Sequence, residues 1–374
     1  MTARRLRLGM VGGGEGAFIG AVHRIAARLD DQYQLVAGAF SSRAEVAARS
    51  GAALHIEPDR CYASWQSMAE REAAREDGID VVAIVTPNHL HVPVARTFLA
   101  QGIHVICDKP LGLTLDEGRT LADDIARSGC RFVLTHNYSA LPMVREARTR
   151  VANGELGEIR SVEVEYLQGW LNERVELTDN KQASWRADPA LAGAGAAGDI
   201  ATHAWQLAAF VSGMLPEALR GELLTRVAGR QIDDEVFAEM RYASGARGRL
   251  WASQVATGYE NDLRLRIVGT RASLAFRQQQ PNELTILPHD APAYVVTRNG
   301  QGISAEVALA CRTPAGHPEG YLEGFAQIYR EAAQLIRGEA MPLLPGIADG
   351  IAGMQFIARL RQSSEQEGAW VAWA

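Results

Sequence analysis

The sequence predicts an α/β domain built on a doubly wound parallel sheet, followed by an α+β domain with a large, mainly antiparallel open sheet. The 374 residues exceed what one hydrophobic core comfortably holds, which indicates two domains. In the first third, short apolar segments alternate with helical stretches, a pattern typical of parallel sheets. After Gly157, apolar and charged residues alternate with period two, as in antiparallel strands with one wet face. We place the two domains at residues 1–137 and 138–374.

The elements of the first domain follow from local signals. The third strand, 79–86, is apolar at nearly every position, as a strand covered on both faces must be. Thr114 and Glu117 form a capping box that opens a helix through about Arg127, with Gly129 just past its end. The expected strands are 6–11, 34–40, 79–86, 104–108 and 131–135, and further helices cover 21–29 and a stretch from about residue 43.

The second domain combines period-two strands with a few helices. The run SVEVEY at 161–166 alternates apolar and charged side chains, so that one face is buried and the other is wet. The other strands expected here are 235–242, 247–255, 263–268 and 273–277. One helix interrupts the strands and two close the chain, over 199–211, 321–336 and 347–364.

Composition and charge exclude several classes of function. A net charge of −6 gives no basic face for nucleic acid. No apolar run approaches the roughly 20 residues that a membrane-spanning helix needs, so we expect no membrane partner. The N-terminus turns from Arg-rich to Gly-rich and leaves no room for a signal-peptide apolar region. The four cysteines lie far apart without a C-x-x-C pair, which predicts free thiols and a cytoplasmic location.

A glycine-rich loop follows the first strand and leads into the first helix. In this position glycines allow a tight turn and a close approach to a pyrophosphate, which then sits at the helix N-terminus. The loop therefore predicts a dinucleotide-binding Rossmann fold. The spacing fits a short fingerprint ending at Ala17, or a longer one ending at Gly20 if the loop carries an insertion. The candidate contacts are Gly12, Gly14, Ala17, Phe18, Ile19 and Gly20.

The end of the second strand bears on the choice of cofactor. The acidic residue that usually binds the ribose 2′-hydroxyl is missing there, and Ser41, Ser42 and Arg43 stand in its place. Two hydroxyls and an arginine can hold a 2′-phosphate, which slightly favours NADP over NAD. Alternatively, one serine caps the next helix and Arg43 points to water, so NAD stays open.

Three further motifs converge with the glycine loop on one family. They are TPNHLH at 86–91, CDKP at 107–110 and GDIATH at 198–203. In this order, from Leu6 to the final helices, the set resembles the Gfo/Idh/MocA family of sugar and cyclitol oxidoreductases. Asp108 stands where the family usually has glutamate, a change that preserves charge. The segments 166–170 and 184–186 are further similar to members that oxidise a ring hydroxyl of sugars or anhydrosugars.

The chemistry of alcohol oxidation fits three residues of these motifs. Asp199 and His203 are four apart on one expected helix and share a face. Histidine suits the general base, and Asp199 can orient its ring. Lys109 follows a parallel strand, at the sheet edge where ligands bind, and its ammonium can bond the reacting oxygen. The resemblance implies these same roles. Taken singly, each also fits a structural role: a first-turn acid, a core histidine and an exposed loop lysine.

We expect the remaining candidate residues to contact cofactor or substrate. The resemblance implies nicotinamide contacts just past the third strand, where Asn88 could also cap a helix. Tryptophans could stack on a sugar ring, although core packing is their commoner role. The loop with His317 either reaches the pocket or only begins a helix. The cofactor set adds Thr86, Pro87, Asn88, His89, Asp108, Lys109 and Asn137, and the substrate set is Lys109, Tyr138, Gln168, Trp170, Trp185, Arg186, Asp199, His203 and His317. His89 and His91 have no evident third partner, so we expect no metal site.

We therefore expect an NAD(P)-dependent dehydrogenase that acts on a secondary hydroxyl of a sugar, sugar derivative or cyclitol. Two alternatives share the fold: glycoside cleavage through transient oxidation with a tightly held NAD, and a dinucleotide-binding sensor without catalysis. By analogy with folds that carry a broad antiparallel sheet, we expect a homodimer or homotetramer.

Overall fold

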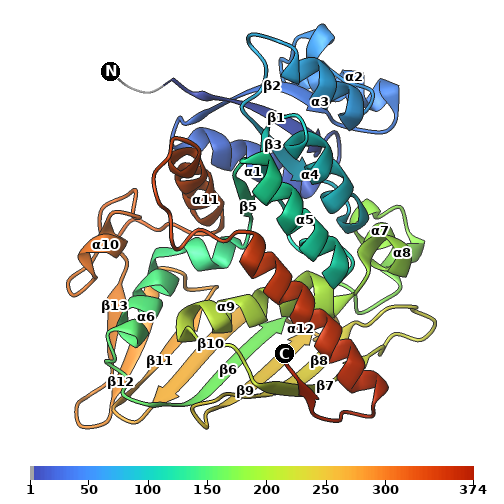
Figure 1. Ribbon diagram of the computed structural model, residues 1–374. Coiled ribbons are helices and arrows are strands. Elements are labelled where there is room, and N and C mark those ends of the chain that lie inside the picture. Colours follow the sequence, from blue (N-terminus) through green and yellow to red (C-terminus); the bar gives the residue numbers. More distant parts are fainter. Residues whose placement is uncertain (1–3) are drawn as a thin grey trace. The chain divides into compact units, whose positions relative to one another are not determined.

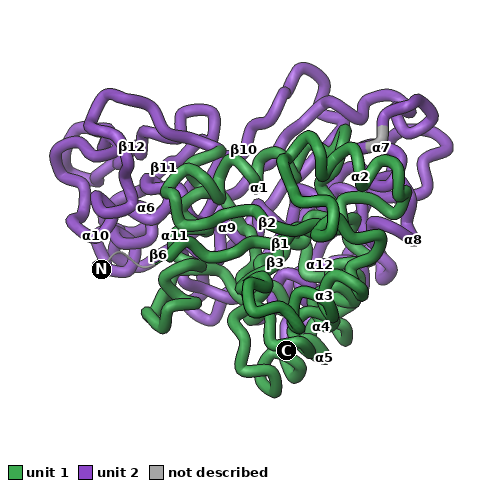
Figure 2. The backbone as a smooth tube through the Cα atoms, turned by 90° about the horizontal axis from the view of Figure 1, so that it is seen from above, with its two compact units in different colours: residues 1–137, 322–351 green, residues 138–321, 352–374 purple. Residues whose placement is uncertain are grey.

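The computed structural model describes residues 4–374, which fold into two compact units (Figure 2). Unit 1 runs through Asn137 and adds Leu322–Ile351; unit 2 comprises Tyr138–Tyr321 and Ala352–Ala374. The chain thus returns to the first unit late in the sequence. The spacing of apolar residues along the sequence does not predict this return.

Unit 1 contains a parallel sheet with the strand order β2-β1-β3-β4-β5, which confirms the predicted doubly wound domain (Figure 1). The central strand β3 is buried at every position, as its apolar sequence requires. The strands are β1 (Leu6–Gly12), β2 (Tyr33–Ala39), β3 (Val81–Val85), β4 (His104–Cys107) and β5 (Phe132–Leu134). The helices are α1 (Phe18–Leu29), α2 (Ala44–Ala53), α3 (Trp65–Ala73), α4 (His91–Leu99), α5 (Leu115–Ser128) and α11 (Tyr321–Ile336). The first residue of α11, Tyr321, is assigned to unit 2.

Helix α5 forms as its local signals predict. The Thr114 hydroxyl accepts a hydrogen bond from the Glu117 backbone N–H at 3.2 Å, and the Glu117 carboxylate accepts one from the Thr114 N–H at 3.0 Å. Gly129 ends the helix at a φ of 67°, a conformation that glycine adopts without strain. The capping box and the terminal glycine thus set both ends of the helix.

Helix α11 is held in unit 1 by an aromatic cluster around Tyr329. The Tyr33 hydroxyl donates to the Tyr329 carbonyl at 2.7 Å. The His23 Nδ1 lies 2.9 Å from the Tyr329 hydroxyl, and the His23 ring also packs 5.0 Å from that of Phe325. Burial lowers the pKa of His23 from 6.5 to about 4, so the ring is neutral in the folded protein at neutral pH.

Because folded His23 is neutral, we expect the protein to lose stability in acid. Between pH 6.5 and about 4 the unfolded chain binds a proton that folded His23 refuses, so the free energy of unfolding falls as the pH drops. The full contribution of His23 to the free energy of unfolding is about 3 kcal/mol. His23→Gln, which keeps a polar partner for Tyr329, should lose less stability over this window than the wild type. Urea unfolding above pH 6.5 and near pH 4 tests this, and equal losses in both proteins would contradict it.

Unit 2 contains a sheet with the order β13-β12-β11-β10-β6-β9-β8-β7-β14, in which β6 and β9 pair in parallel and the other neighbours antiparallel. The predicted large, mainly antiparallel sheet is confirmed. Its strands are β6 (Ile159–Leu167), β7 (Ala218–Leu224), β8 (Glu235–Arg241), β9 (Arg247–Ser253), β10 (Asp262–Gly269), β11 (Ala272–Arg277), β12 (Glu283–Pro288), β13 (Tyr294–Thr297) and β14 (Val371–Ala372).

Within residues 4–374, the helices that pack on this sheet cover one face and leave the other open. Helix α9 packs on the central strands β6, β9 and β10, and α6 packs on β11 and β12 (Figure 1). Trp205 of α9 stacks 5.5 Å from both Phe356 and Trp373. Besides α6 (Pro142–Ala152) and α9 (Thr202–Ser212), the unit contains α7 (Lys181–Arg186), α8 (Pro189–Ala192), α10 (Ala305–Ala308) and most of α12 (Ile347–Glu365).

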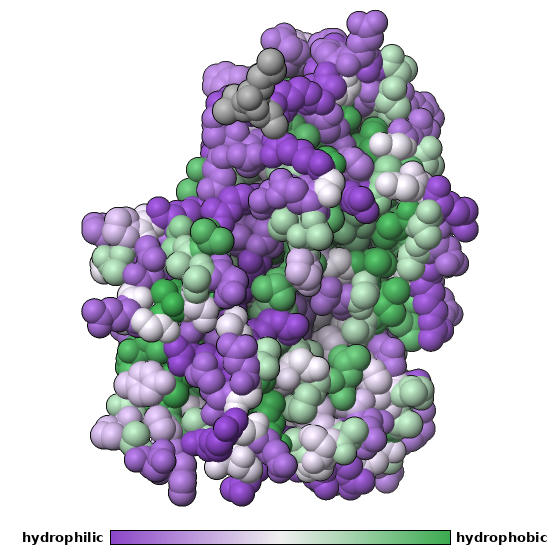
Figure 3. Space-filling view, turned by 60° about the vertical axis from the view of Figure 1, so that its left-hand side comes forward, coloured by the Kyte–Doolittle hydropathy of each residue, from purple (hydrophilic) through white to green (hydrophobic). Residues whose placement is uncertain are grey.

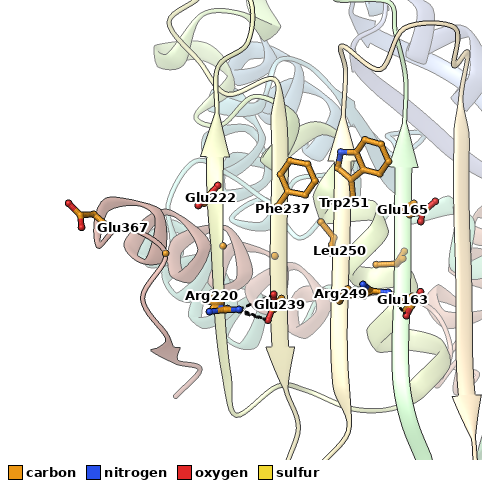
Figure 4. Close-up of a pocket in the computed structure, with 14 residues that line it drawn as sticks. Glu163, Glu165, Arg220, Glu222, Phe237, Glu239, Arg249, Leu250, Trp251 and Glu367 are labelled. Carbon is orange, nitrogen blue, oxygen red and sulfur yellow. Dashed lines mark hydrogen bonds and ion pairs between the residues drawn. The ribbon is translucent and has the colours of Figure 1, made fainter.

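Charged side chains dominate the open face. Arg249 of β9 pairs with Glu163 of β6 at 2.7 Å, and Arg220 of β7 pairs with Glu239 of β8 at 3.0 Å. Beside these pairs, the rings of Phe237 and Trp251 stack 5.8 Å apart (Figure 4). A cavity of about 580 Å³ lies over these strands, and none of its lining residues is a predicted site residue.

The remaining surface is mixed. On the face shown in Figure 3, polar and apolar residues are interspersed. Among residues 4–374, no helix is both long and apolar enough to span a membrane. All four cysteines, each in the described part of the chain, are free thiols.

Candidate active site

The glycine loop of unit 1 links β1 to α1 by a close approach of backbone to backbone. Gly12 and Gly13 have φ values of 81° and 70°, which side chains rarely adopt. A Cβ on Gly20 would lie 2.3 Å from the Gly13 Cα, so neither position has room for a side chain. The Arg24 guanidinium donates to the Gly13 carbonyl at 2.6 Å and holds the loop in place. The loop packs closely against the helix at Gly20, which favours the longer glycine fingerprint that ends at Gly20.

The beginning of α1 fits the pyrophosphate of a dinucleotide. The N-cap residue Ala17 provides no side-chain cap, and the first turn contains no acidic residue. The N–H groups of this turn are therefore available to an anion, as in other phosphate-binding helices. Phe18, at the first position of the helix, is 61% exposed.

Polar atoms near the ends of β3 and β5 also fit a bound cofactor. Within residues 4–374, the Thr86 hydroxyl, the His89 Nδ1 and the Asn137 amide nitrogen are buried without a hydrogen-bond partner. Such atoms are costly unless a ligand or water satisfies them. Thr86 lies beside the glycine loop, because a Cβ on Gly12 would approach its methyl group to 3.1 Å. The residues present thus fit a nicotinamide dinucleotide.

The end of β2 is open to a ligand. The Ser41 hydroxyl accepts a hydrogen bond from the Arg43 N–H at 3.2 Å. Helix α2 begins after Arg43 without a side-chain cap, so neither serine caps it. Ser42 and Arg43 are exposed.

The predicted catalytic lysine follows β4 in a tightly bonded loop. The Asp108 carboxylate accepts from the Lys109 N–H at 2.9 Å and from the Thr135 hydroxyl at 2.7 Å. The buried His91 lies between this loop and the one after β3, with Nδ1 2.7 Å from the Pro110 carbonyl and Nε2 2.9 Å from the Thr86 carbonyl. Both ring nitrogens of His91 thus face backbone carbonyls, and the imidazole bridges the two loops.

In unit 2 the motif with Asp199 and His203 begins in a π-helical turn. The sequence predicts one regular helix over 199–211, whereas the structure has a π-turn, η5 (Ala197–Ala201), followed by α9. The Asp233 carboxylate accepts from the Gly195 and Ala197 N–H groups at 2.8 and 2.7 Å, which fixes the entry to this turn. Single π-turns occur frequently at functional sites.

Two side chains orient the Asp199 carboxylate. Gln254, just past β9, donates to Oδ2 at 2.9 Å, and the Arg186 Nε of α7 lies 3.3 Å from the same atom. The Arg186 guanidinium also covers the Trp185 ring at 4.2 Å. Sequence reasoning missed Gln254, because a glutamine at a strand end carries no distinctive signal.

His203 is buried among tyrosines. The residue is 9% exposed. Its ring lies edge-on to that of Tyr138, with 5.0 Å between the ring centroids, and 6.3 Å from the ring of Tyr166. The two tyrosine hydroxyls are 2.6 Å apart. Burial raises the pKa of the Tyr138 hydroxyl, so it stays protonated at neutral pH.

The other predicted substrate residues divide into two groups. Gln168 and Trp170 bond to each other at 3.0 Å, and Gln168 bonds to Asn261 at 2.6 Å, close to the tyrosines. His317 is exposed, and none of the contacts described for it reaches these residues. Its loop is held by Arg298 and Glu319, a buried ion pair at 3.0 Å. The structure therefore joins Tyr138, Gln168 and Trp170, joins Arg186 to Asp199, and leaves His317 apart.

Comparison with known proteins identifies the class. Residues 6–136 match an oxidoreductase family with an NAD-binding Rossmann fold, and residues 144–275 match the GFO/IDH/MocA C-terminal domain. The protein is thus an NAD-dependent oxidoreductase, a dehydrogenase that acts on CH–OH groups. The chain belongs to the GFO/IDH/MocA family.

Three relatives illustrate the similarity. An oxidoreductase structure from Sinorhizobium meliloti is 48% identical, covers 99% of this chain and 100% of its own, and has a TM-score of 0.90. The structure of an inositol dehydrogenase homologue from Azotobacter vinelandii, in complex with NAD+, is 34% identical. It covers 99% of this chain and 98% of its own, with a TM-score of 0.95. Levoglucosan dehydrogenase of Pseudarthrobacter phenanthrenivorans is 31% identical over 76% of each chain.

Proposed function

We propose that the protein oxidises or reduces a secondary hydroxyl of a sugar, a sugar derivative or a cyclitol. The observation that carries this proposal is the set around η5: a buried imidazole, His203, preceded by a carboxylate, Asp199, that Gln254 and Arg186 hold in place. The tyrosines and Trp170 beside it supply the polar and aromatic surface that a ring polyol requires. The names of the inositol and levoglucosan dehydrogenase relatives point to the same substrate class.

In this proposal His203 accepts the hydroxyl proton as general base. Asp199 orients the ring and stabilises the imidazolium that forms. Lys109 donates a hydrogen bond to the reacting oxygen and stabilises its developing charge. The glycine loop and the start of α1 hold the pyrophosphate of the dinucleotide, whose nicotinamide supplies the hydride acceptor.

The test is the near-ultraviolet absorbance of reduced nicotinamide, with purified protein, NAD or NADP, and a panel of myo-inositol, levoglucosan, aldoses and glycosides. A rise with a ring polyol supports the proposal. Glycoside cleavage with no net change in the cofactor would instead indicate the transient-oxidation reaction. Dinucleotide binding without any turnover would indicate a sensor.

We further propose that Ser41, Ser42 and Arg43 hold a 2′-phosphate, so that NADP is used at least as well as NAD. The exposed guanidinium and the absence of a carboxylate at 39–43 support this. Arg43→Ala should raise the KM for NADP roughly tenfold and leave that for NAD nearly unchanged, because only NADP loses a charge-assisted bond. Steady-state kinetics with both cofactors check the prediction, and equal effects on the two would refute it.

We also propose that the open face of the sheet packs against a second copy of the chain. Its alternating arginines and glutamates, with the Phe237–Trp251 stack between them, are complementary to the same face of another copy. Trp251→Asp should therefore convert the wild-type oligomer to monomers at micromolar concentration, as measured by sedimentation velocity. A monomeric wild type would contradict the proposal.

A further inference from the structure

A chain of side-chain hydrogen bonds in unit 2 begins beside His203 and ends at Trp170. The Tyr138 hydroxyl lies 2.6 Å from that of Tyr166, and Tyr166 donates to the Asn261 amide oxygen at 2.8 Å. Gln168 donates to this same oxygen at 2.6 Å, and Trp170 donates to the Gln168 amide oxygen at 3.0 Å. Asn261 thus stands where two branches meet, one from the tyrosines and one from the tryptophan.

Trp170, at the end of this series of hydrogen bonds, fixes the direction of every bond in it. An indole N–H can only donate, so the Gln168 oxygen faces Trp170 and the Gln168 nitrogen faces Asn261. Asn261 must then present its oxygen rather than its nitrogen. That oxygen accepts the Tyr166 proton, which leaves the Tyr166 oxygen to accept the proton of Tyr138.

The consequence falls on the Tyr138 hydroxyl. The Tyr138 proton is committed to Tyr166, so the Tyr138 oxygen can act only as an acceptor toward a ligand. Its ring packs edge-on to His203, at 5.0 Å between centroids. A ligand in this place is bound best when one of its own hydroxyls donates to Tyr138. Asn261 itself lies one residue before β10 and is half-buried.

We propose that Asn261 is a positioning residue which, by accepting from Tyr166 and Gln168 at once, makes Tyr138 an acceptor and selects ring polyols that present a hydroxyl donor beside His203. The inference rests on the proposed function, because it concerns substrate choice at the same site. Without the Asn261 oxygen, Tyr166 is free to donate toward Tyr138, which then loses its fixed role.

Two variants distinguish the acceptor role of Asn261 from the effect of its side-chain size. Asn261→Leu keeps the size and removes the acceptor, whereas Asn261→Asp keeps an oxygen for both donors. Titration calorimetry with myo-inositol, levoglucosan and their monodeoxy analogues gives binding without turnover. The wild type should bind at least one parent polyol and discriminate against one deoxy analogue, roughly tenfold for one lost hydrogen bond. N261L should lose most of this discrimination, and N261D should restore it, with dinucleotide binding unchanged in both.

The matched control is Asn172→Leu, because Asn172 donates to the Thr257 hydroxyl at 2.8 Å, outside the chain. If N261L does not fold, Asn261→Ser takes its place, since the shorter side chain cannot reach both donors. A wild type that binds no member of the panel, or an N261L protein that discriminates as the wild type does, overturns the inference. Binding with discrimination but without cofactor reduction would instead refute the proposed function and leave the role of Asn261 standing.

Discussion

His203→Ala is expected to abolish turnover, with a fall of at least about 10³-fold in kcat. General-base catalysis alone accounts for about 10²–10⁴-fold, and no other group is proposed for this task. Dinucleotide binding should be retained, because the glycine loop and the N-terminus of α1 belong to unit 1. Steady-state kinetics and a cofactor titration of the same preparation measure both quantities.

The control for this variant is His289→Ala, which removes an exposed histidine of unit 2 and should leave kcat unchanged. Turnover by the His203 variant within a few-fold of the wild type would contradict the base assignment. His203 would then be a core histidine packed between Tyr138 and Tyr166.

Lys109→Met is expected to lower kcat by about 10²–10³-fold, the effect of removing a hydrogen-bond donor from a developing oxyanion. Methionine keeps the length of the side chain but lacks the ammonium. The backbone there should persist, because Asp108 binds the Lys109 N–H and His91 faces the Pro110 carbonyl. Rapid-mixing kinetics of cofactor reduction measure the chemical step directly.

Lys109→Arg is the matched variant, since it retains the charge with a different shape and should recover part of the rate. A loss of less than about tenfold in the methionine variant would assign Lys109 a structural role. A raised KM with an unchanged kcat would mean that the ammonium binds the substrate without acting on the transition state.

Much of the fold is predictable from local sequence. The buried strand β3, the capping box of α5 and the period-two strands β6 and β10 each follow from side chains within one segment. No local signal predicts strands β7, β12, β13 and β14, which are short or lie toward the sheet edges. The return of α11 to unit 1 depends on Tyr33 and His23, about 300 residues away, and no local pattern encodes it.

The site divides in the same way. Motifs with fixed spacing, such as the one ending at His203, are visible in the sequence. Gln254 and Asn261 are not, because their positions depend on strand pairing. Strand β6 lies between β9 and β10, so that Leu167 pairs with both Ser253 and Asp262. This register brings Gln168, Gln254 and Asn261 to one end of the sheet. The π-turn before α9 is equally hidden, since it is stabilised by Asp233 from a distant segment.

In the proposed reaction, the protein removes hydride from a ring carbon that bears a hydroxyl. The most direct measurement uses a polyol of the panel with deuterium on its ring carbons, followed by mass spectrometry of the recovered nicotinamide. We expect the wild type to yield reduced cofactor that contains deuterium, and His203→Ala to yield no labelled cofactor. Reduced cofactor without deuterium, or an unchanged cofactor pool while the polyol is consumed, would contradict it.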